Sequence, residues 1–207
     1  MRGKIPGIAG PGALLLAVLL GSSAPAEEPG GLVITRVATG SVGERSGLRP
    51  GDRLLRWGQG AAGGTLASPF DLTEVELEHA PRGETRLTGL REGAPLAVAL
   101  FPDDWGLEVR PELAAEPLAI YEGARRQLTD GDANGALAQL LGLAQHPSVS
   151  AVLDARLWVA WETVRACIDA GRLDGAKAAA ERGAREARQQ GRLEIEAQFL
   201  TELARAL

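Results

Sequence analysis

Residues 31–57, GLVITRVATGSVGERSGLRPGDRLLRW, decide the fold of the first half of this chain. The stretch Gly31–Val37 predicts a short strand, because its β-branched side chains pack well on a pleated surface. A Gly-Ser turn and one or two helical turns follow, and Gly47 ends them. Pro50-Gly51-Asp52 predicts a tight turn that leads into a second strand, Asp52–Trp57. This order predicts a small domain built mainly from strands.

Turn residues divide the rest of the first half into short elements. Gly58–Ser68 is rich in glycine and alanine, which predicts a flexible loop. Pro69–His79 predicts a helix, since Ser68 suits the N-cap and proline suits the first helical position. The alternation of apolar and polar residues in Glu84–Leu90 and in Pro95–Phe101 predicts two more strands, joined by an Arg-Glu-Gly turn.

The second half of the chain is helical, and predicted strands end near Pro111. Five helices are predicted: Ala114–Leu128, Ala133–Gln145, Ser150–Ala170, Gly175–Gln190 and Arg192–Leu207. The single cysteine, Cys167, lies on an apolar helix face and is expected to be buried. The sequence therefore predicts an α+β protein, with a small β-rich domain over residues 31–111 and an all-α part over residues 114–207.

The first 26 residues have the pattern of a secretory signal peptide. Arg2 and Lys4 are basic, Ala13–Leu20 is a short apolar run, and Ala24-Pro25-Ala26 supplies small residues for cleavage. The alternative is an uncleaved membrane anchor, but the run is about half the roughly 20 residues that a spanning helix needs. We therefore expect an exported protein, periplasmic or secreted, that begins near Glu27 and has no membrane span after cleavage.

Charge and residue types argue against nucleic acid binding and against catalysis. The formal net charge is −5, and loss of the leader would remove Arg2 and Lys4, so the chain should bind nucleic acid poorly, because phosphate contacts need clustered Lys and Arg. His79 and His146 lie in different predicted domains without ligand-like neighbours. Ser41 lacks the Gly-x-Ser-x-Gly context of a hydrolase nucleophile. We expect a protein that is not an enzyme and has no cofactor and no metal site.

The order of elements in residues 31–57 resembles the bacterial type of PDZ domain: strand, Gly-Ser, short helix, Ser-Gly-Leu, Arg-Pro-Gly-Asp, strand. The resemblance extends from Gly31 to about Pro111 and implies a small β-sandwich or barrel. In that family an extended peptide adds as a strand to a sheet edge, and its terminal carboxylate sits in a nest of backbone N–H groups. The implied ligand is a protein or peptide C-terminus, or an extended segment.

The helical part resembles tetratricopeptide (TPR) repeats at two of its turns. In each turn a glycine, Gly131 or Gly171, ends one helix, and an alanine five residues later, Ala136 or Ala176, allows the next helix to pack closely. The two glycines are 40 residues apart, against about 34 in the standard repeat. The repeats are therefore degenerate, and a generic helical bundle is the alternative.

The PDZ resemblance places the peptide site at an unusual position. The nest loop of that family, x-Φ-Gly-Φ, normally precedes the strand that Gly31–Val37 resembles, but only Glu27–Gly30 stands there. Asp104-Trp105-Gly106-Leu107 fits the loop instead, so the domain completes itself from its C-terminal side. The expected site residues are Trp105, Gly106, Leu107 and Val109 on one wall and Phe70, Leu72 and Val75 on the helix opposite. The alternative is a packed linker, and the acidic Asp103 and Asp104 would repel a carboxylate.

These expectations combine into an exported, non-enzymatic module for protein–protein interaction, with PDZ-like peptide binding and a TPR-like scaffold. Its pattern also resembles the front part of exported bacterial proteins that carry a PDZ domain, helical repeats and a large C-terminal domain. That resemblance is carried by Ser68–Leu72, Ala80–Gly83 and Trp105–Leu107. The alternative function is therefore the regulatory or substrate-binding region of a protease, serine or CHAT caspase-like, whose catalytic domain is not in this chain. A structural envelope protein is a third alternative.

The last predicted helix raises a separate expectation. Without a following helix, Phe199 and Leu203 would be half-covered, because a repeat array normally needs a capping helix. We therefore expect this helix to dock on a partner, or the chain to be a fragment of a longer protein.

Overall fold

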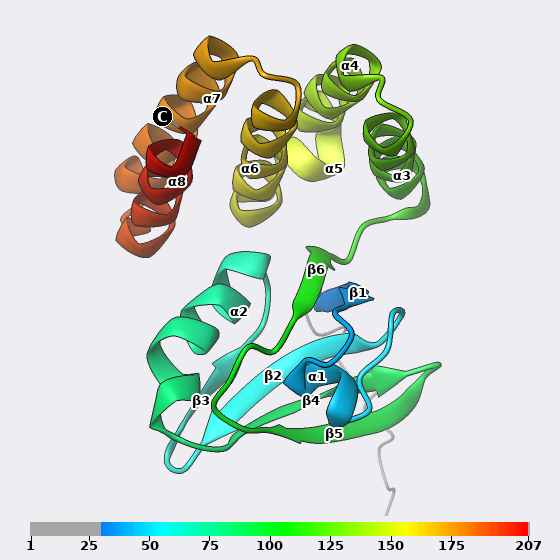
Figure 1. The fold of residues 1–207 in the computed structure, drawn as a ribbon, viewed down its shortest axis with the longest axis vertical. Helices are drawn as coiled ribbons and strands as arrows, with labels where there is room; N and C mark the ends of the chain where they lie inside the picture. The colour runs from blue at the N-terminus through cyan, green and yellow to red at the C-terminus, as the bar shows by residue number, and fades with distance from the viewer. Residues whose placement is uncertain (1–29, 207) are drawn as a thin grey trace, which may run out of the picture.

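The computed structural model describes residues 30–206, so the expected signal peptide lies outside the described residues. The described chain is α+β, as predicted (Figure 1). We call residues 32–111 the sheet region and residues 115–206 the helical region. The strands are β1 Leu32–Val37, β2 Arg53–Gln59, β3 Ala62–Thr65, β4 Thr85–Arg91, β5 Ala94–Leu100 and β6 Leu107–Pro111. Two helices interrupt them, α1 Val42–Arg45 and α2 Pro69–Glu74, and α2 continues through Val75–His79 and a short turn, Ala80–Arg82.

The six strands form one antiparallel sheet. Its order is β5-β4-β2-β1-β6, with β3 paired to β2 beside this path. The sheet is open, because β5 and β6 lie at its two ends, whereas the sequence resemblance implied a sandwich or barrel. The last strand, β6, returns to pair with the first, and Val109 lies opposite Ile34. The edge of the sheet next to α2 is therefore made by a strand from the C-terminal end of the region.

The predicted flexible loop, Gly58–Ser68, contains a strand instead. Its residues Ala62–Thr65 form β3, which pairs with the end of β2. A Cβ atom on Gly63 would lie 2.9 Å from the Trp57 carbonyl oxygen, and one on Gly64 would lie 3.0 Å from the Trp57 indole nitrogen. The prediction was wrong because these glycines reflect close approach of two backbones, which composition does not distinguish from flexibility.

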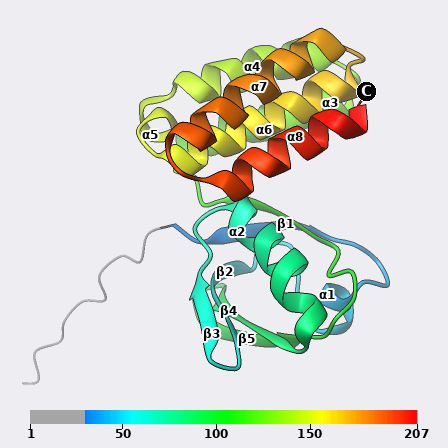
Figure 2. The same cartoon turned by 90° about the vertical axis from the view of Figure 1, so that its left-hand side faces the viewer.

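The helical region is a row of antiparallel helices. They are α3 Ala115–Thr129, α4 Ala133–Gln145, α5 Pro147–Ser150, α6 Leu153–Asp169, α7 Leu173–Gln189 and α8 Leu193–Ala206. Figure 2 shows α4 and α7 on the side away from the sheet, with α3, α6 and α8 nearer to it. Cys167 is buried, as expected, and within residues 30–206 no helix has the length and apolar character needed to cross a membrane.

Three helix ends in this region share one backbone arrangement. Gly131, Gly171 and Gly191 all have positive φ angles, which favour glycine. In each case the N–H of the following residue donates to the carbonyl five residues back: Asp132 to Gln127, Arg172 to Cys167 and Arg192 to Ala187, at 2.8–2.9 Å. Ala136 and Ala176 are fully buried where the next helices pack. The repeated turn seen in the sequence at the first two glycines thus occurs a third time, before α8.

The expectation that Phe199 is half-covered was wrong. Its ring is fully buried between α7 and the sheet region. It packs over Gly183, where a Cβ atom would lie 2.4 Å from the ring, and its centroid is 6.1 Å from that of Phe70. Leu203 packs partly buried against the same core. The sheet region supplies the cover that a further helix would otherwise provide, although Leu193 and Leu200 of α8 remain exposed.

Candidate functional site

The first turn of α2 joins the two regions. Phe70 is buried, and its ring lies edge-on to Trp161 of α6 at 5.9 Å. The neighbouring Asp71 accepts the N–H groups of residues 67 and 68, each at 2.8 Å, and so fixes the start of the helix. Its second carboxylate oxygen lies 3.4 Å from Arg192, which also pairs with Asp154 at 2.6 Å. An aromatic contact and a shared arginine therefore hold α2 against the helical region.

The far end of α2 is fixed to the sheet. Between Val75 and His79 the helix widens, and the Ala80 N–H donates to the Val75 carbonyl five residues back. The Gln59 side chain on β2 donates to the carbonyls of His79 and Gly83, both at 3.0 Å. Because both ends are held, α2 keeps a set distance from β6.

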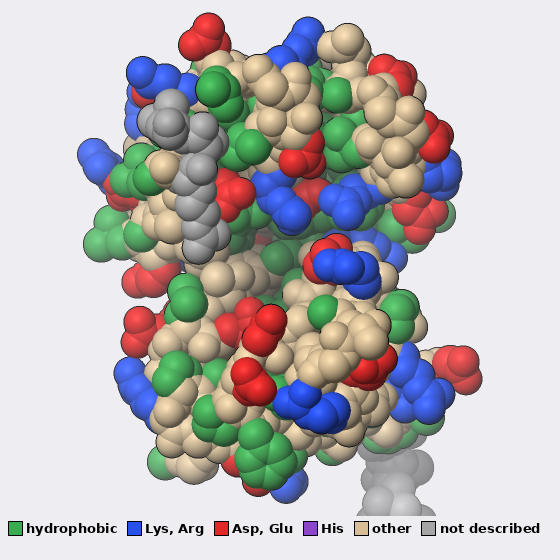
Figure 3. Space-filling model, viewed as in Figure 1, with side chains coloured by type: hydrophobic (Ala, Val, Ile, Leu, Met, Phe, Trp, Pro, Cys, Tyr) green, Lys and Arg blue, Asp and Glu red, His purple; other side chains and the backbone are tan. Residues whose placement is uncertain are grey.

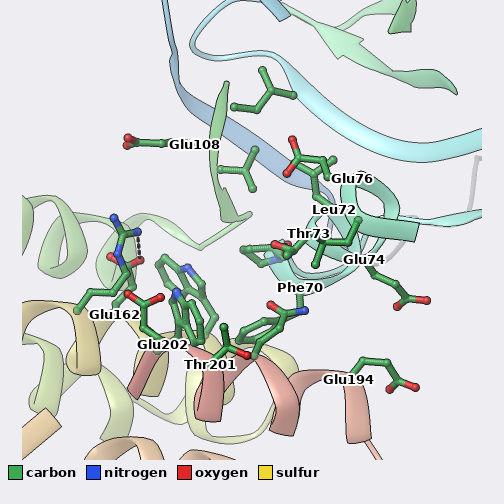
Figure 4. A pocket seen from close by; sticks show the side chains of 18 of the residues that line it. Phe70, Leu72, Thr73, Glu74, Glu76, Glu108, Glu162, Glu194, Thr201 and Glu202 are labelled. Atoms are coloured by element: carbon green, nitrogen blue, oxygen red, sulfur yellow. Dashed lines mark hydrogen bonds and ion pairs between the residues drawn. The ribbon is translucent and has the colours of Figure 1, made fainter. Parts of the chain in front are cut away.

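A cavity of about 530 Å³ lies between the two regions (Figures 3 and 4). The sheet region contributes residues of β1, β6 and α2 with its continuation, and the helical region contributes residues of α3, α6 and α8. Apolar and aromatic side chains form much of its wall: Phe70, Leu72, Leu77, Leu107, Val109, Tyr121, Trp158 and Trp161. A concave, largely apolar space of this size is the usual setting of a binding site.

The structure brings four of the seven expected site residues to this cavity. Leu107 and Val109 on β6 face it from one side, and Phe70 and Leu72 of α2 from the other. Trp105 and Val75 lie instead in the core of the sheet region, where each is at most 2% exposed. The Trp105 indole N–H donates to the Phe101 carbonyl at 3.2 Å. The sequence pattern showed that these two residues are apolar. It did not show that they are buried in the core of the sheet region.

The seventh expected residue, Gly106, shapes the turn before β6. Its φ angle is +61°, and a Cβ atom there would lie 2.4 Å from the Cβ of Ser41. The Gly106 N–H donates to the Asp104 carboxylate at 2.8 Å. The Gly106 carbonyl accepts from the Ala38 N–H, also at 2.8 Å, and so starts the pairing of β6 with β1. The glycine is thus needed for close packing of this turn on α1.

One edge of β6 is open. Its other edge pairs with β1, and among the described strands none pairs on the side that faces α2. Its five residues form an edge of roughly 16 Å, at about 3.3 Å per residue. Unpaired N–H and C=O groups along such an edge can bond an added strand.

The cavity wall carries more negative than positive charge. Its charged residues are seven glutamates, Glu74, Glu76, Glu78, Glu108, Glu162, Glu194 and Glu202, and two arginines, Arg125 and Arg165. Both arginines face Glu162, at 3.6 and 3.7 Å, and Arg125 also lies 3.9 Å from Glu108. Burial raises the pKa of Glu162 despite these arginines and the Tyr121 hydroxyl at 3.5 Å. The cations of the wall are therefore already engaged with its own carboxylates.

Glu76 occupies the space between α2 and β6, beside Leu72 (Figure 4). Burial raises the pKa of its carboxyl to about 7, and the charge of Asp104, on the turn before β6, adds to the effect. The ionised form of Glu76 is thus disfavoured, because it loses hydration and meets a like charge.

We expect replacement of Glu76 with glutamine to stabilise the protein above neutral pH. The folded-state pKa of about 7 exceeds the ordinary value near 4.5, so native stability falls as pH rises between these values and levels off above them. The variant lacks this loss. Its free energy of unfolding should exceed that of the native protein by up to about 3 kcal/mol near pH 8 and should equal it near pH 4. Urea unfolding at several pH values measures the difference. Glu78→Gln is the matched control, because Glu78 is exposed and pairs with Arg82; equal pH profiles for the two variants would contradict the assignment.

The sequence analysis missed the helical half of the site. Tyr121, Trp158, Trp161 and Glu162 line the cavity from α3 and α6. One signal was present: Trp158, Trp161 and Glu162 follow at i, i+3 and i+4, so they lie on one helix face that combines aromatic and acidic groups. Nothing local showed that this face meets α2.

Sequence comparison with family models and curated proteins assigns this chain to no family. No family model matches it, and no curated protein is significantly similar in sequence. Within residues 30–206, no group of three or more His, Cys, Asp and Glu side chains is placed to hold a metal ion. The case for function therefore rests on the cavity and its open strand edge.

Proposed function

We propose that this protein is an exported, non-enzymatic binding module that holds an extended polypeptide segment in the cavity between its two regions. The observation that carries this proposal is the open edge of β6, which faces α2 across an apolar cavity of about 530 Å³. An added strand would bond to the backbone of β6, and its alternate side chains would enter the cavity. The likeness of the sheet region to PDZ domains and of the helical turns to TPR repeats supports this assignment.

The helical region has a definite part in the proposed function. Aromatic side chains of α6, Trp158 and Trp161, form the wall opposite Leu107. A segment lying along β6 would therefore contact both regions at once, and the helical region would act as the second half of the site. Secretion by the expected leader would place this binding outside the cytoplasm.

Replacing Leu107 with aspartate should abolish peptide binding. Leu107 faces the cavity at the start of β6, and a carboxylate there would be desolvated beside an acidic wall. Peptides selected from a random display library on the purified protein, measured by calorimetry, should lose affinity by about 100-fold or more. Leu107→Ala serves as a milder second variant, with a smaller loss in the same direction.

Leu141→Asp is the control for this experiment. Leu141 is an exposed leucine of α4 and does not line the cavity. Its replacement should leave the affinity unchanged. Unchanged affinity of the Leu107→Asp protein, with the fold intact by circular dichroism, would reject binding at β6.

A further inference from the structure

Two backbone donors of the turn before β6, and two at the start of the adjoining helix α1, are already occupied. The N–H of Gly106 bonds to the Asp104 carboxylate at 2.8 Å, and the Asp104 N–H bonds to Asp103 at 2.9 Å. The N–H groups of Val42 and Gly43, at the start of the adjoining α1, donate to the carbonyls of residues 104 and 105, both at 3.1 Å. A terminal carboxylate arriving here would find these donors taken and acidic side chains beside them.

The charge of the cavity wall favours a positively charged ligand group over a carboxylate. Glutamates outnumber arginines on the wall, and the two arginines, Arg125 and Arg165, are engaged with Glu162. Figure 3 shows acidic side chains gathered on the part of the sheet region that holds α2, next to the hollow between the regions. Glu76 lines the cavity among these side chains, and the negative charge of Asp104 acts on it; a cation beside Glu76 would relieve that repulsion.

The same space suits the aliphatic part of a long basic side chain. Leu72 and Leu107 line the cavity beside Glu76, and Trp158 and Trp161 offer aromatic surface across it. A lysine or arginine packs its methylene groups on apolar surface while its charged end reaches a carboxylate, and aromatic faces attract the cation further. Apolar walls with a buried carboxylate therefore suit a basic side chain better than they suit a C-terminal carboxylate.

From the cavity, its charge and the occupied turn we infer that the segment held along β6 is an internal stretch of a partner protein that places a lysine or arginine side chain against Glu76. This inference rests on the proposed peptide-binding function and specifies its ligand. The C-terminal carboxylate expected from the sequence resemblance is not needed for binding.

Selection from two random dodecapeptide libraries tests this inference, one displayed with free C-termini and one displayed internally. Internal peptides should be enriched, with a lysine or arginine at one position. Synthetic copies with an amide or a free acid at the C-terminus should bind equally by calorimetry. Changing that basic residue to glutamine should weaken binding by about tenfold or more.

Variants of the protein test whether the basic residue of the peptide acts through Glu76. Glu76→Gln should weaken binding of the basic peptide by about tenfold, while the peptide that lacks the basic residue should bind both proteins alike. Affinity of the native protein should rise between about pH 6 and pH 8, as Glu76 loses its proton, and the variant should not show this rise. Glu84→Gln, at an exposed position outside the cavity, is the matched control and should change nothing.

Asp104→Ala gives a separate readout. It frees the Gly106 N–H and removes a negative charge, so peptides with a free C-terminus should gain affinity relative to their amides. Selected peptides that require a free C-terminus on the native protein, or that lack a basic residue, would overturn this inference while leaving the peptide-binding function standing. Failure of both libraries to yield any binder would overturn the peptide-binding function itself.

Discussion

Replacing Phe70 with alanine is expected to lower the free energy of unfolding by about 3–5 kcal/mol, because a large buried ring is removed and its space cannot fully close. The ring contacts Trp161 at 5.9 Å and Phe199 at 6.1 Å, and these two are 5.4 Å apart. All three residues belong to one cluster that joins α2 to α6 and α8. The change should therefore also loosen the sheet region from the helical region.

Two measurements check this expectation. Urea unfolding gives the loss of stability, and small-angle X-ray scattering should show a larger radius of gyration as the two regions move apart. Phe101→Ala is the matched control, since Phe101 is 58% exposed and its loss leaves no cavity. A Phe70→Ala protein as stable and as compact as the Phe101→Ala protein would show that the contact between the two regions does not depend on this ring.

Replacing Asp52 with alanine is expected to destabilise the sheet region by about 3 kcal/mol, since it removes a buried carboxylate that accepts several hydrogen bonds. The Asp52 carboxylate is buried and accepts two hydrogen bonds from Arg91, both at 2.7 Å, and one from the Arg49 N–H at 2.8 Å. Arg91 also donates to the Gly47 carbonyl at 2.7 Å. One aspartate thus ties the Pro-Gly turn to the end of β4.

The pH dependence of this variant has a defined sign. Burial by itself would raise the pKa of Asp52, but the hydrogen bonds from Arg91 and from the Arg49 N–H, with the charge of Arg91, outweigh it and lower the pKa. The ionised group therefore stabilises the fold above its ordinary pKa near 4, and this contribution is lost as pH falls through the lower folded value. The stability difference between native and Asp52→Ala proteins, measured by urea unfolding, should be full at neutral pH and should shrink in acid.

Asp103→Ala is the control for the aspartate experiment. Asp103 pairs with Arg45 at 3.3 Å, but both side chains are more than half exposed. Exposed ion pairs contribute little, so this change should cost less than about 1 kcal/mol. Equal losses for the two variants would mean that burial of Asp52 does not matter.

Much of the secondary structure followed from local patterns in the sequence. The helix Ala133–Gln145 has the predicted bounds, and the strand predicted over Gly31–Val37 begins one residue later, at Leu32. These predictions succeeded because β-branched runs, turn glycines and helical periodicity act over a few residues. The glycines at positions 131 and 171 likewise marked helix ends, where a positive φ angle is needed.

Close packing between distant segments escaped the sequence analysis. Gly89 lies inside β4, where a Cβ atom would sit 1.8 Å from the Arg53 carbonyl on β2. The glycines of β3 suggested a loop for the same reason: composition shows that a side chain is absent but not which backbone takes its place. Trp105 and Val75, expected in the peptide site, were likewise taken into the core by packing that no local pattern reveals.

The sequence by itself determined the class of the fold, the turns, and two walls of the candidate site, Leu107 with Val109 and Phe70 with Leu72. Only the tertiary structure decided that these walls share a cavity with α3, α6 and α8, and that glutamates outnumber arginines on its wall. The physical reason is distance along the chain. Arg192 and Asp71, which help to hold the two regions together, are 121 residues apart, and a contact at that separation is set by the packing of the whole chain, not by neighbouring residues.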